Sequence, residues 1–204
     1  MKNGREIIGI IGAGPGGLCV AATLQARGIP FEILDAGSRV GGIWDIDRSD
    51  SPMYESAHFI SSRTLSGFPG FPMPDSYPDY PKHEQVLKYI ESYAHHHDLE
   101  RHVTFDTRVE SAKRAEGGGW MLQLNSGEQR IYSGLCAASG MNWHPRVPEL
   151  PGTWNRESYH SGRYRSPDEF QGKRVLIVGA GNSGCDIACD AARRAERAFI
   201  SVRR

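Results

Sequence analysis

The same glycine pattern occurs twice in this 204-residue chain, at residues 8–17 and again at residues 175–184. In each copy a run of apolar residues leads into a glycine-rich turn, and good helix formers follow, from Leu18 to Arg27 and from Cys185 to Arg194. A buried strand, a tight turn and a helix start form the arrangement that binds a pyrophosphate at a helix N-terminus. One such turn could serve packing alone, but two copies with the same internal spacing favour nucleotide binding. The repeat therefore predicts an α/β fold with two Rossmann-like dinucleotide-binding units.

The two copies differ at the place where the ribose of a bound nucleotide would lie. After the first copy, Phe31–Leu34 is typical of a second strand and ends in Asp35, whose carboxylate suits a free ribose 2'-hydroxyl. At the matching place after the second copy stand Ser201, Arg203 and Arg204, with no carboxylate. Two guanidiniums could bind a 2'-phosphate through forked hydrogen bonds, although a solvated charge cluster is the alternative. We therefore expect different dinucleotides in the two units, the second of them phosphorylated.

The composition is that of an ordinary globular protein, with 39% hydrophobic residues, 24% charged residues and a formal net charge of zero. Because there is no basic excess, neither nucleic acid nor a membrane is an expected partner. No apolar run approaches the ~20 residues of a membrane-spanning helix, and the first strand begins too early to leave room for a signal peptide. The four cysteines show no pairing pattern, so we expect a reduced, cytoplasmic protein.

The sequence between the two copies predicts a helix followed by a β-meander. Apolar residues recur at helical spacing from His83 to His96. Short strands are expected at Val103–Phe105 and Thr107–Ala112, and Trp120–Leu124 is expected to pair back on the second of these as a hairpin. A further turn leads into a strand over Ile131–Ala137. The pattern indicates a meander inserted between parts of a parallel sheet.

Two proline-rich segments are expected to be irregular. Residues 68–81 alternate proline with aromatic residues, which favours an extended loop packed on its own domain over a ligand for a partner module. Residues 145–167, rich in proline and glycine, are expected to be the linker to the second unit. The chain stops just after the second strand of that unit, and a doubly wound domain needs further strands. We therefore expect the front part of a longer protein or a truncated product.

Several motifs spread over nearly the whole chain resemble those of one flavoprotein family. They are Gly12, Gly14 and Gly17 of the first turn, Gly-Gly-x-Trp at Gly41–Trp44, the Phe-Pro run at Phe71–Tyr80, Ala-Ser-Gly at Ala138–Gly140, and Gly-Asn-Ser-Gly-x-Asp-Ile-Ala at Gly181–Ala188. On these residues the chain resembles the flavin-containing monooxygenases, which have Baeyer–Villiger relatives. The resemblance implies FAD and NADPH as cofactors, with O2 and a small molecule carrying a nucleophilic nitrogen or sulfur as substrates. It leaves room for a homodimer.

The resemblance also implies a domain order and a set of binding residues. It implies an FAD-binding domain over residues 1–148, a linker over residues 149–172, and the beginning of an NADP-binding domain over residues 173–204. The residues expected to contact FAD are Gly12, Gly14, Gly16, Gly17, Asp35, Gly42, Trp44, Val109, Ser139 and Gly140. Those expected to contact NADPH are Gly179, Gly181, Asn182, Ser183, Gly184, Ser201, Arg203 and Arg204. No catalytic side chain is assigned, because the cofactor carries the hard chemistry.

The chain departs from the family pattern at two places. In the linker fingerprint, Leu150 replaces phenylalanine and the gap between Gly152 and His160 is longer, while Tyr164 keeps its spacing and favours the branch that oxygenates nitrogen and sulfur. Ile60 stands where many of these members place an asparagine beside the flavin. Because isoleucine has no hydrogen-bonding side-chain group, leakage to hydrogen peroxide is a competing expectation. An NAD(P)H oxidase or reductase that makes peroxide is therefore one alternative function, and a non-catalytic nucleotide-binding fragment is another.

The remaining histidines and cysteines do not indicate a metal or disulfide-exchange site. The histidines of His95–His97 are adjacent in the expected helix and so point in different directions. Cys185 and Cys189 share a helical face but have no further ligand pair nearby, so we expect no metal. Residues 1–135 contain no close cysteine pair, which excludes a pyridine-nucleotide disulfide reductase.

Overall fold

The structure is a computed structural model, and it describes residues 6–149 and 151–203. The chain divides into two compact units. The first consists of the chain up to Gly42, together with Phe68–Phe71 and Leu87–Met141. The second consists of Ile43–Gly67, Pro72–Val86 and the chain from Asn142 onward. Each unit contains one of the two glycine turns, so each is described by itself. Among the described residues, no helix is both long and apolar enough to cross a bilayer.

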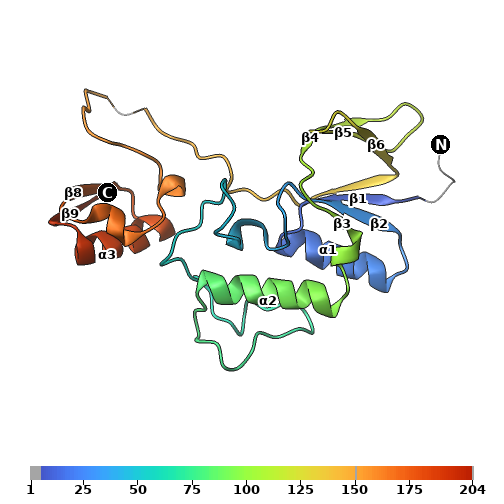
Figure 1. Ribbon diagram of the computed structural model, residues 1–204, viewed down its shortest axis with the longest axis horizontal. Helices are drawn as coiled ribbons and strands as arrows, with labels where there is room; N and C mark the ends of the chain where they lie inside the picture. Colours follow the sequence, from blue (N-terminus) through green and yellow to red (C-terminus); the bar gives the residue numbers. More distant parts are fainter. Residues whose placement is uncertain (1–5, 150, 204) are drawn as a thin grey trace. The chain divides into compact units, whose positions relative to one another are not determined.

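The first unit is built on a parallel sheet in the order β3-β2-β1-β7 (Figure 1). Its strands are β1 (Ile8–Ile11), β2 (Phe31–Leu34), β3 (Val103–Thr104) and β7 (Gly134–Ala137). Helix α1 (Pro15–Ala26) connects β1 to β2. It begins earlier than predicted because Pro15 occupies the first helical position, where its fixed φ suits a helix and its missing N–H costs no hydrogen bond. Ile10, Leu18 and Ile33 are fully buried.

An antiparallel meander follows β3 in the chain, as predicted, and has the order β4-β5-β6. Its strands are β4 (Val109–Arg114), β5 (Trp120–Leu124) and β6 (Gln129–Tyr132). The single strand predicted over Ile131–Ala137 is wrong. The chain instead leaves the meander at Ser133, so that Tyr132 pairs with Trp120 of β5 while Gly134 pairs with Ile8 of β1. An apolar run cannot show that its two halves belong to different sheets.

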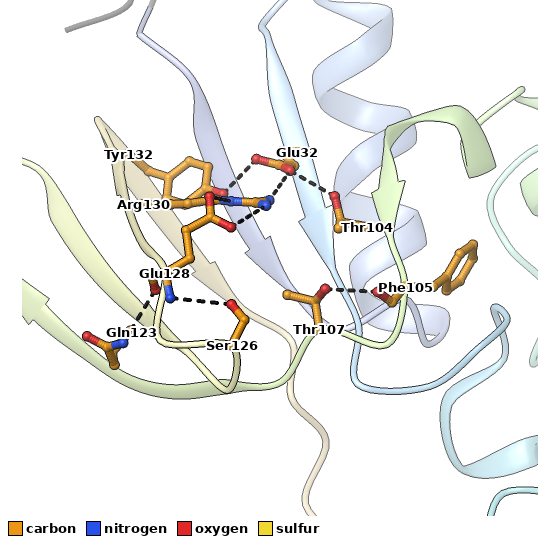
Figure 2. A network of polar contacts seen from close by, with 9 residues as sticks. All are labelled: Glu32, Thr104, Phe105, Thr107, Gln123, Ser126, Glu128, Arg130 and Tyr132. Atoms are coloured by element: carbon orange, nitrogen blue, oxygen red, sulfur yellow. Dashed lines mark hydrogen bonds and ion pairs between the residues drawn. The ribbon is translucent and has the colours of Figure 1, made fainter.

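A polar network joins the meander to the parallel sheet (Figure 2). The Glu32 carboxylate on β2 accepts hydrogen bonds from the Tyr132 hydroxyl at 2.7 Å, from the Arg130 guanidinium at 2.6 Å and from the Thr104 hydroxyl at 2.9 Å. Burial and then the Glu32 carboxylate raise the pKa of the Tyr132 phenol. The Tyr132 ring lies so close to Gly9 that a Cβ there would come within 2.9 Å of it. Glycine at this strand position is therefore required by packing.

Helix α2 (His83–His96) has the predicted bounds, and its residues Val86, Ile90 and Tyr93 are buried. The Phe68 ring stacks on Tyr93 with ring centroids 3.8 Å apart, and the Phe71 ring meets the same tyrosine edge-on at 5.4 Å. The aromatic residues at the start of the proline-rich segment therefore pack on their own unit. This confirms the interpretation of that part as a packed loop.

The second unit contains the parallel pair β8 (Arg174–Val178) and β9 (Arg197–Ser201), connected by α3 (Asn182–Arg194). Four short 3-10 helices occur along the described chain: η1 (Gly42–Trp44), η2 (Glu100–His102), η3 (Ser161–Arg163) and η4 (Pro167–Phe170). The core of the second unit is formed by Met53, Tyr54, Ala57, Tyr164, Phe170, Ile177, Ile187 and Ala191. Its members come from three distant parts of the sequence. Residues 53–57 thus pack with the helix that follows the second glycine turn.

Candidate dinucleotide-binding sites

The two glycine turns have nearly the same backbone geometry. The first glycine of each turn has a positive φ, 104° at Gly12 and 107° at Gly179, a region that glycine adopts far more readily than other residues. The second glycine precedes the helix with φ and ψ of −78° and −177° at Gly14, and of −76° and −178° at Gly181. Two separate stretches of sequence therefore form two turns with the same backbone conformation.

The third glycine of each turn is required by packing of the helix on the turn. A Cβ at Gly17 would overlap the carbonyl oxygen of Gly12, and a Cβ at Gly184 would overlap that of Gly179. The second glycine differs, because a Cβ at Gly181 would meet no described atom within 4 Å. Packing therefore explains the third glycine of each turn but leaves Gly181 unexplained, whereas a Cβ at Gly14 would be in ordinary contact with Gly42. The backbone at the second glycine is the part that must stay bare for a phosphate to approach.

Both helices begin in a way that suits a bound anion. Among the described residues, neither α1 nor α3 has a side-chain cap or an acidic residue in its first turn. The first N–H groups of a helix need partners from outside the helix, and the helix dipole favours negative charge there. Both sites thus fit a pyrophosphate group.

In the first unit, the predicted FAD residues gather at the carboxyl ends of the central strands. Ser139 and Gly140 lie just after β7, separated from it by Ala138. The N–H of Ala138 donates to the Ile11 carbonyl at 2.9 Å. A Cβ at Gly12 would overlap the Ala138 carbonyl. A Cβ at Gly16 would lie 4.0 Å from the Ala138 side chain. Strand β1 lies between β2 and β7, so the turn stands where the strand order reverses. Open α/β sheets bind ligands at this point.

The Gly-Gly-x-Trp segment is divided between the two units. Gly41 donates its N–H to the Ala13 carbonyl at 3.1 Å, and a Cβ at Gly14 would come within 3.5 Å of Gly42. The glycine pair therefore lies against the first turn. Trp44 belongs to the second unit, where its ring meets that of Phe59 edge-on at 4.9 Å.

Asp35, the carboxylate expected to take the ribose, is buried, with 5% of its surface exposed. Its Oδ2 accepts the N–H of Ala13 at 2.6 Å and its Oδ1 accepts the N–H of Gly37 at 2.6 Å. Beside it, Thr107 donates its N–H to the Asp35 carbonyl at 2.8 Å. Val109 packs against the core cluster that contains Leu34, the last residue of β2. The side chain thus ties the end of β2 to the glycine turn, a role that the sequence analysis missed. A ribose hydroxyl would share the carboxylate with two backbone N–H groups.

In the second unit, Asn182 and Ser183 begin α3, and Gly179 donates its N–H to the Ser201 carbonyl at 2.8 Å. The end of β9 therefore lies against the turn. Arg203 is exposed and lines a hollow of about 550 Å³ together with Arg146, Pro148 and Glu149. Arg204, the other predicted contact of the 2'-phosphate, lies outside the described residues, as does Leu150 of the linker fingerprint. Arg146 was not predicted, because an arginine in a proline-rich linker has no distinguishing neighbours in sequence.

The fold and the two glycine turns agree with the match of the chain to one protein family. A family model described as flavin-binding monooxygenase-like matches residues 5–204. The chain belongs to this family. Membership confirms the resemblance to the flavin-containing monooxygenases and, with it, the predicted α/β class with a Rossmann-like first unit.

Known proteins are similar to the chain over nearly all of its length. Flavin-containing monooxygenase 1 of Homo sapiens is 32% identical over 210 residues, covering 96% of this chain and 40% of the human protein. The S-allyl-L-cysteine S-oxygenase of Allium sativum has a TM-score of 0.88 and 28% identity, covering 97% of this chain and 51% of its own. OTEMO, solved in complex with FAD and NADP, has a TM-score of 0.80 and 26% identity, and the match covers 99% of this chain and 39% of the OTEMO chain. The chain thus spans about half or less of these proteins, and the predicted cofactor pair agrees with that complex.

Proposed function

We propose that the protein is an FAD- and NADPH-dependent monooxygenase that inserts one atom of O2 into a small nucleophile carrying nitrogen or sulfur. The observation that carries the proposal is the pair of turns with one backbone geometry and opposite charge at the ribose end, Asp35 in the first and Arg203 in the second. Family membership and the likeness to an S-oxygenase support it. We assign FAD to the first turn and NADPH to the second.

The chain's own residues position the two cofactors. When bound, the flavin accepts hydride from the nicotinamide coenzyme and activates O2, chemistry that belongs to the cofactor. The N–H groups that open α1 and α3 would each bind a pyrophosphate, since the bare backbone at Gly14 and Gly181 lets the phosphates approach. Asp35, whose carboxylate already accepts the N–H of Ala13 in the first turn, would also bind and orient the adenosine ribose of FAD. Arg203, with Arg146 in the same hollow, would attract the 2'-phosphate of NADPH.

The visible spectrum of the purified protein tests the proposal most directly. A flavin spectrum that bleaches with NADPH more readily than with NADH is the expected result. Oxygenated product formed in step with NADPH consumption is expected for small amines or sulfides. A colourless protein that oxidises no NADPH would contradict the proposal and favour a non-catalytic nucleotide-binding fragment.

A second candidate function is an NAD(P)H oxidase that releases peroxide. The observation that favours it is Ile60, an apolar residue with 64% of its surface exposed, at the position where the family resemblance implies an asparagine. An aliphatic side chain cannot hold an oxygen species by a hydrogen bond. Hydrogen peroxide formed in equal amount to the NADPH consumed, without oxygenated product, would select this function. Replacing Ile60 by asparagine should then lower the peroxide yield per NADPH.

A further inference from the structure

The segment that leads from β3 to β4 runs beside the end of β2. Asp35 donates its N–H to the Thr104 carbonyl at 3.1 Å, and its own carbonyl accepts the N–H of Thr107 at 2.8 Å. Between these two contacts Asp106 donates its N–H to the Gly37 carbonyl at 2.9 Å. Asp106 has a φ of 52°, a left-handed conformation that aspartate tolerates better than most residues. The chain thus turns at Asp106 while it stays fastened to the residue expected to bind the ribose of FAD.

Val109, at the start of β4, presents its backbone to the open side of the meander. It lies opposite Leu124 of β5. The N–H of Leu124 donates to the Glu128 carbonyl at 2.9 Å, and its carbonyl accepts the N–H of Gly127 at 3.0 Å. Both backbone groups of Leu124 therefore face β6, which makes Val109 and Leu124 a non-hydrogen-bonded pair. Because β4 is the outer strand of the described meander, the N–H and C=O of Val109 point away from its other strands.

An open strand edge of this kind matches the hydrogen-bonding groups of adenine. The amino group of adenine donates and its ring nitrogens accept, while the C=O and N–H of one strand residue offer an acceptor and a donor. Two residues of extended chain, about 7 Å, separate Val109 from Thr107, which contacts Asp35. This is comparable with the length of a nucleoside from its ribose to the far edge of its base. The Val109 backbone therefore suits the adenine of a nucleotide whose ribose lies at Asp35.

Asn125, the first residue after β5, holds the residue before Val109 by two hydrogen bonds. Its Oδ1 accepts the N–H of Arg108 at 3.2 Å, and its N–H donates to the Arg108 carbonyl at 2.9 Å. The side chain thus takes the place of the backbone carbonyl that a regular antiparallel pair would use here. The strand pairing is irregular between Val109 and Ser111, so the ladder alone does not fix Val109. Asn125 fixes the peptide that leads into it.

We propose that Asn125 is a positioning residue for the adenine of FAD. Its side-chain carbonyl holds Arg108 and so presents the N–H and C=O of Val109 to the base, while Asp35 binds the ribose. The inference rests on the proposed function, in which the first turn binds FAD. It adds a residue that lies outside every motif of the family resemblance and acts through the backbone of Val109.

Titration of the flavin-free protein with FAD, and with its analogue that carries hypoxanthine in place of adenine, tests the inference. Hypoxanthine has a carbonyl and a ring N–H where adenine has an amino group and a ring acceptor, so the wild type should bind FAD more tightly. Asn125→Ala should raise the Kd for FAD roughly two- to tenfold, as expected for one lost hydrogen bond. It should change the Kd for the analogue less than twofold, because the reversed base does not match Val109 in either protein.

Two further variants separate the positioning role from stability of the turn. Asn125→Asp keeps an acceptor for the N–H of Arg108, so it should keep the preference for FAD over the analogue. Ser126→Ala is the matched control, since the Ser126 hydroxyl accepts the N–H of Glu128 at 3.3 Å in the same turn (Figure 2). It should leave both Kd values within twofold of the wild type.

The outcomes distinguish this inference from the proposed function. Losses of equal size for FAD and the analogue in Asn125→Ala, or a loss of preference in Ser126→Ala as well, would overturn the inference. Hydrogen exchange of the wild-type protein needs no variant and serves also if Asn125→Ala does not fold. FAD should slow exchange of the Val109 amide, and an unchanged rate in the FAD-bound protein would overturn the inference. A wild-type protein that binds no flavin would overturn the proposed function itself.

Discussion

The N–H of Ala13 in the first glycine turn donates to the carboxylate of Asp35 at the end of β2 over 2.6 Å. The contact joins two residues 22 positions apart and is buried. It makes the turn and the carboxylate one structural element, so the residue expected to read the ribose also maintains the shape of the pyrophosphate site. Binding and folding are therefore linked at this position.

Replacing Asp35 by asparagine should weaken both the folded structure and the binding of FAD. An amide nitrogen would face the N–H of either Ala13 or Gly37, and a buried donor without an acceptor costs about 1–3 kcal/mol. We expect the free energy of unfolding to fall by this amount and the flavin content of the purified protein to fall with it. Urea unfolding followed by circular dichroism measures the first effect, and the flavin absorbance per protein measures the second. Asp79→Asn, at an exposed aspartate, is the control and should change neither.

The second turn allows packing and binding to be separated by two alanine substitutions. Gly184→Ala places a methyl group on the Gly179 carbonyl, so it should destabilise the unit by about 1–3 kcal/mol. Gly181→Ala meets no described atom within 4 Å and has an ordinary φ of −76°, so it should not reduce stability. Its methyl group would instead stand where the pyrophosphate approaches, and NADP+ affinity should fall. A Gly181→Ala protein of normal stability and normal affinity would mean that the turn serves packing alone.

Regular elements with a clear apolar period could be predicted to the residue. The bounds of β2, β5 and α2 agree with the sequence prediction because each is an apolar pattern enclosed by turn residues. The strand over Ile131–Ala137 failed for a different reason. Its residues belong to two sheets, and the change at Ser133 depends on strand pairs far away in sequence.

The residues of the candidate sites also include some that could be predicted from the sequence and some that could not. Gly12 and Gly179 could be predicted because a positive φ and a close backbone approach require glycine at fixed spacing. The burial of Asp35 could not, since its partner Ala13 offers only a backbone N–H, which every residue but proline has. The hydrogen bond between Tyr54 and Asp186 could not be predicted either, because no local pattern relates two residues that are 132 positions apart.

Stability should depend on the ionisation of Glu169. Burial opposes ionisation of this carboxyl, but hydrogen bonds from the N–H groups of Arg165 and Ser166 outweigh it and hold the pKa below the ordinary 4.5. Because the folded pKa is depressed, this contribution is fully present above pH 4.5 and is lost as the pH falls through the folded pKa. Thermal unfolding from pH 6 to pH 3 should show a smaller acid-induced loss of Tm in Glu169→Gln than in the wild type. Exposed Glu196→Gln should follow the wild-type curve.

Arg203 should decide between the two nicotinamide coenzymes. A guanidinium forms charged hydrogen bonds with a 2'-phosphate, each worth roughly 1.5–3 kcal/mol, and has no comparable partner in NADH. Arg203→Ala should therefore weaken NADPH binding by about that amount and leave NADH binding nearly unchanged. Arg197→Ala, at the opposite end of β9, is the matched control and should affect neither coenzyme. Equal losses for NADPH and NADH would contradict the phosphate role and return Arg203 to the alternative of a solvated surface charge. Loss of coenzyme selectivity in Arg146→Ala as well would assign the second guanidinium of the hollow to the same phosphate.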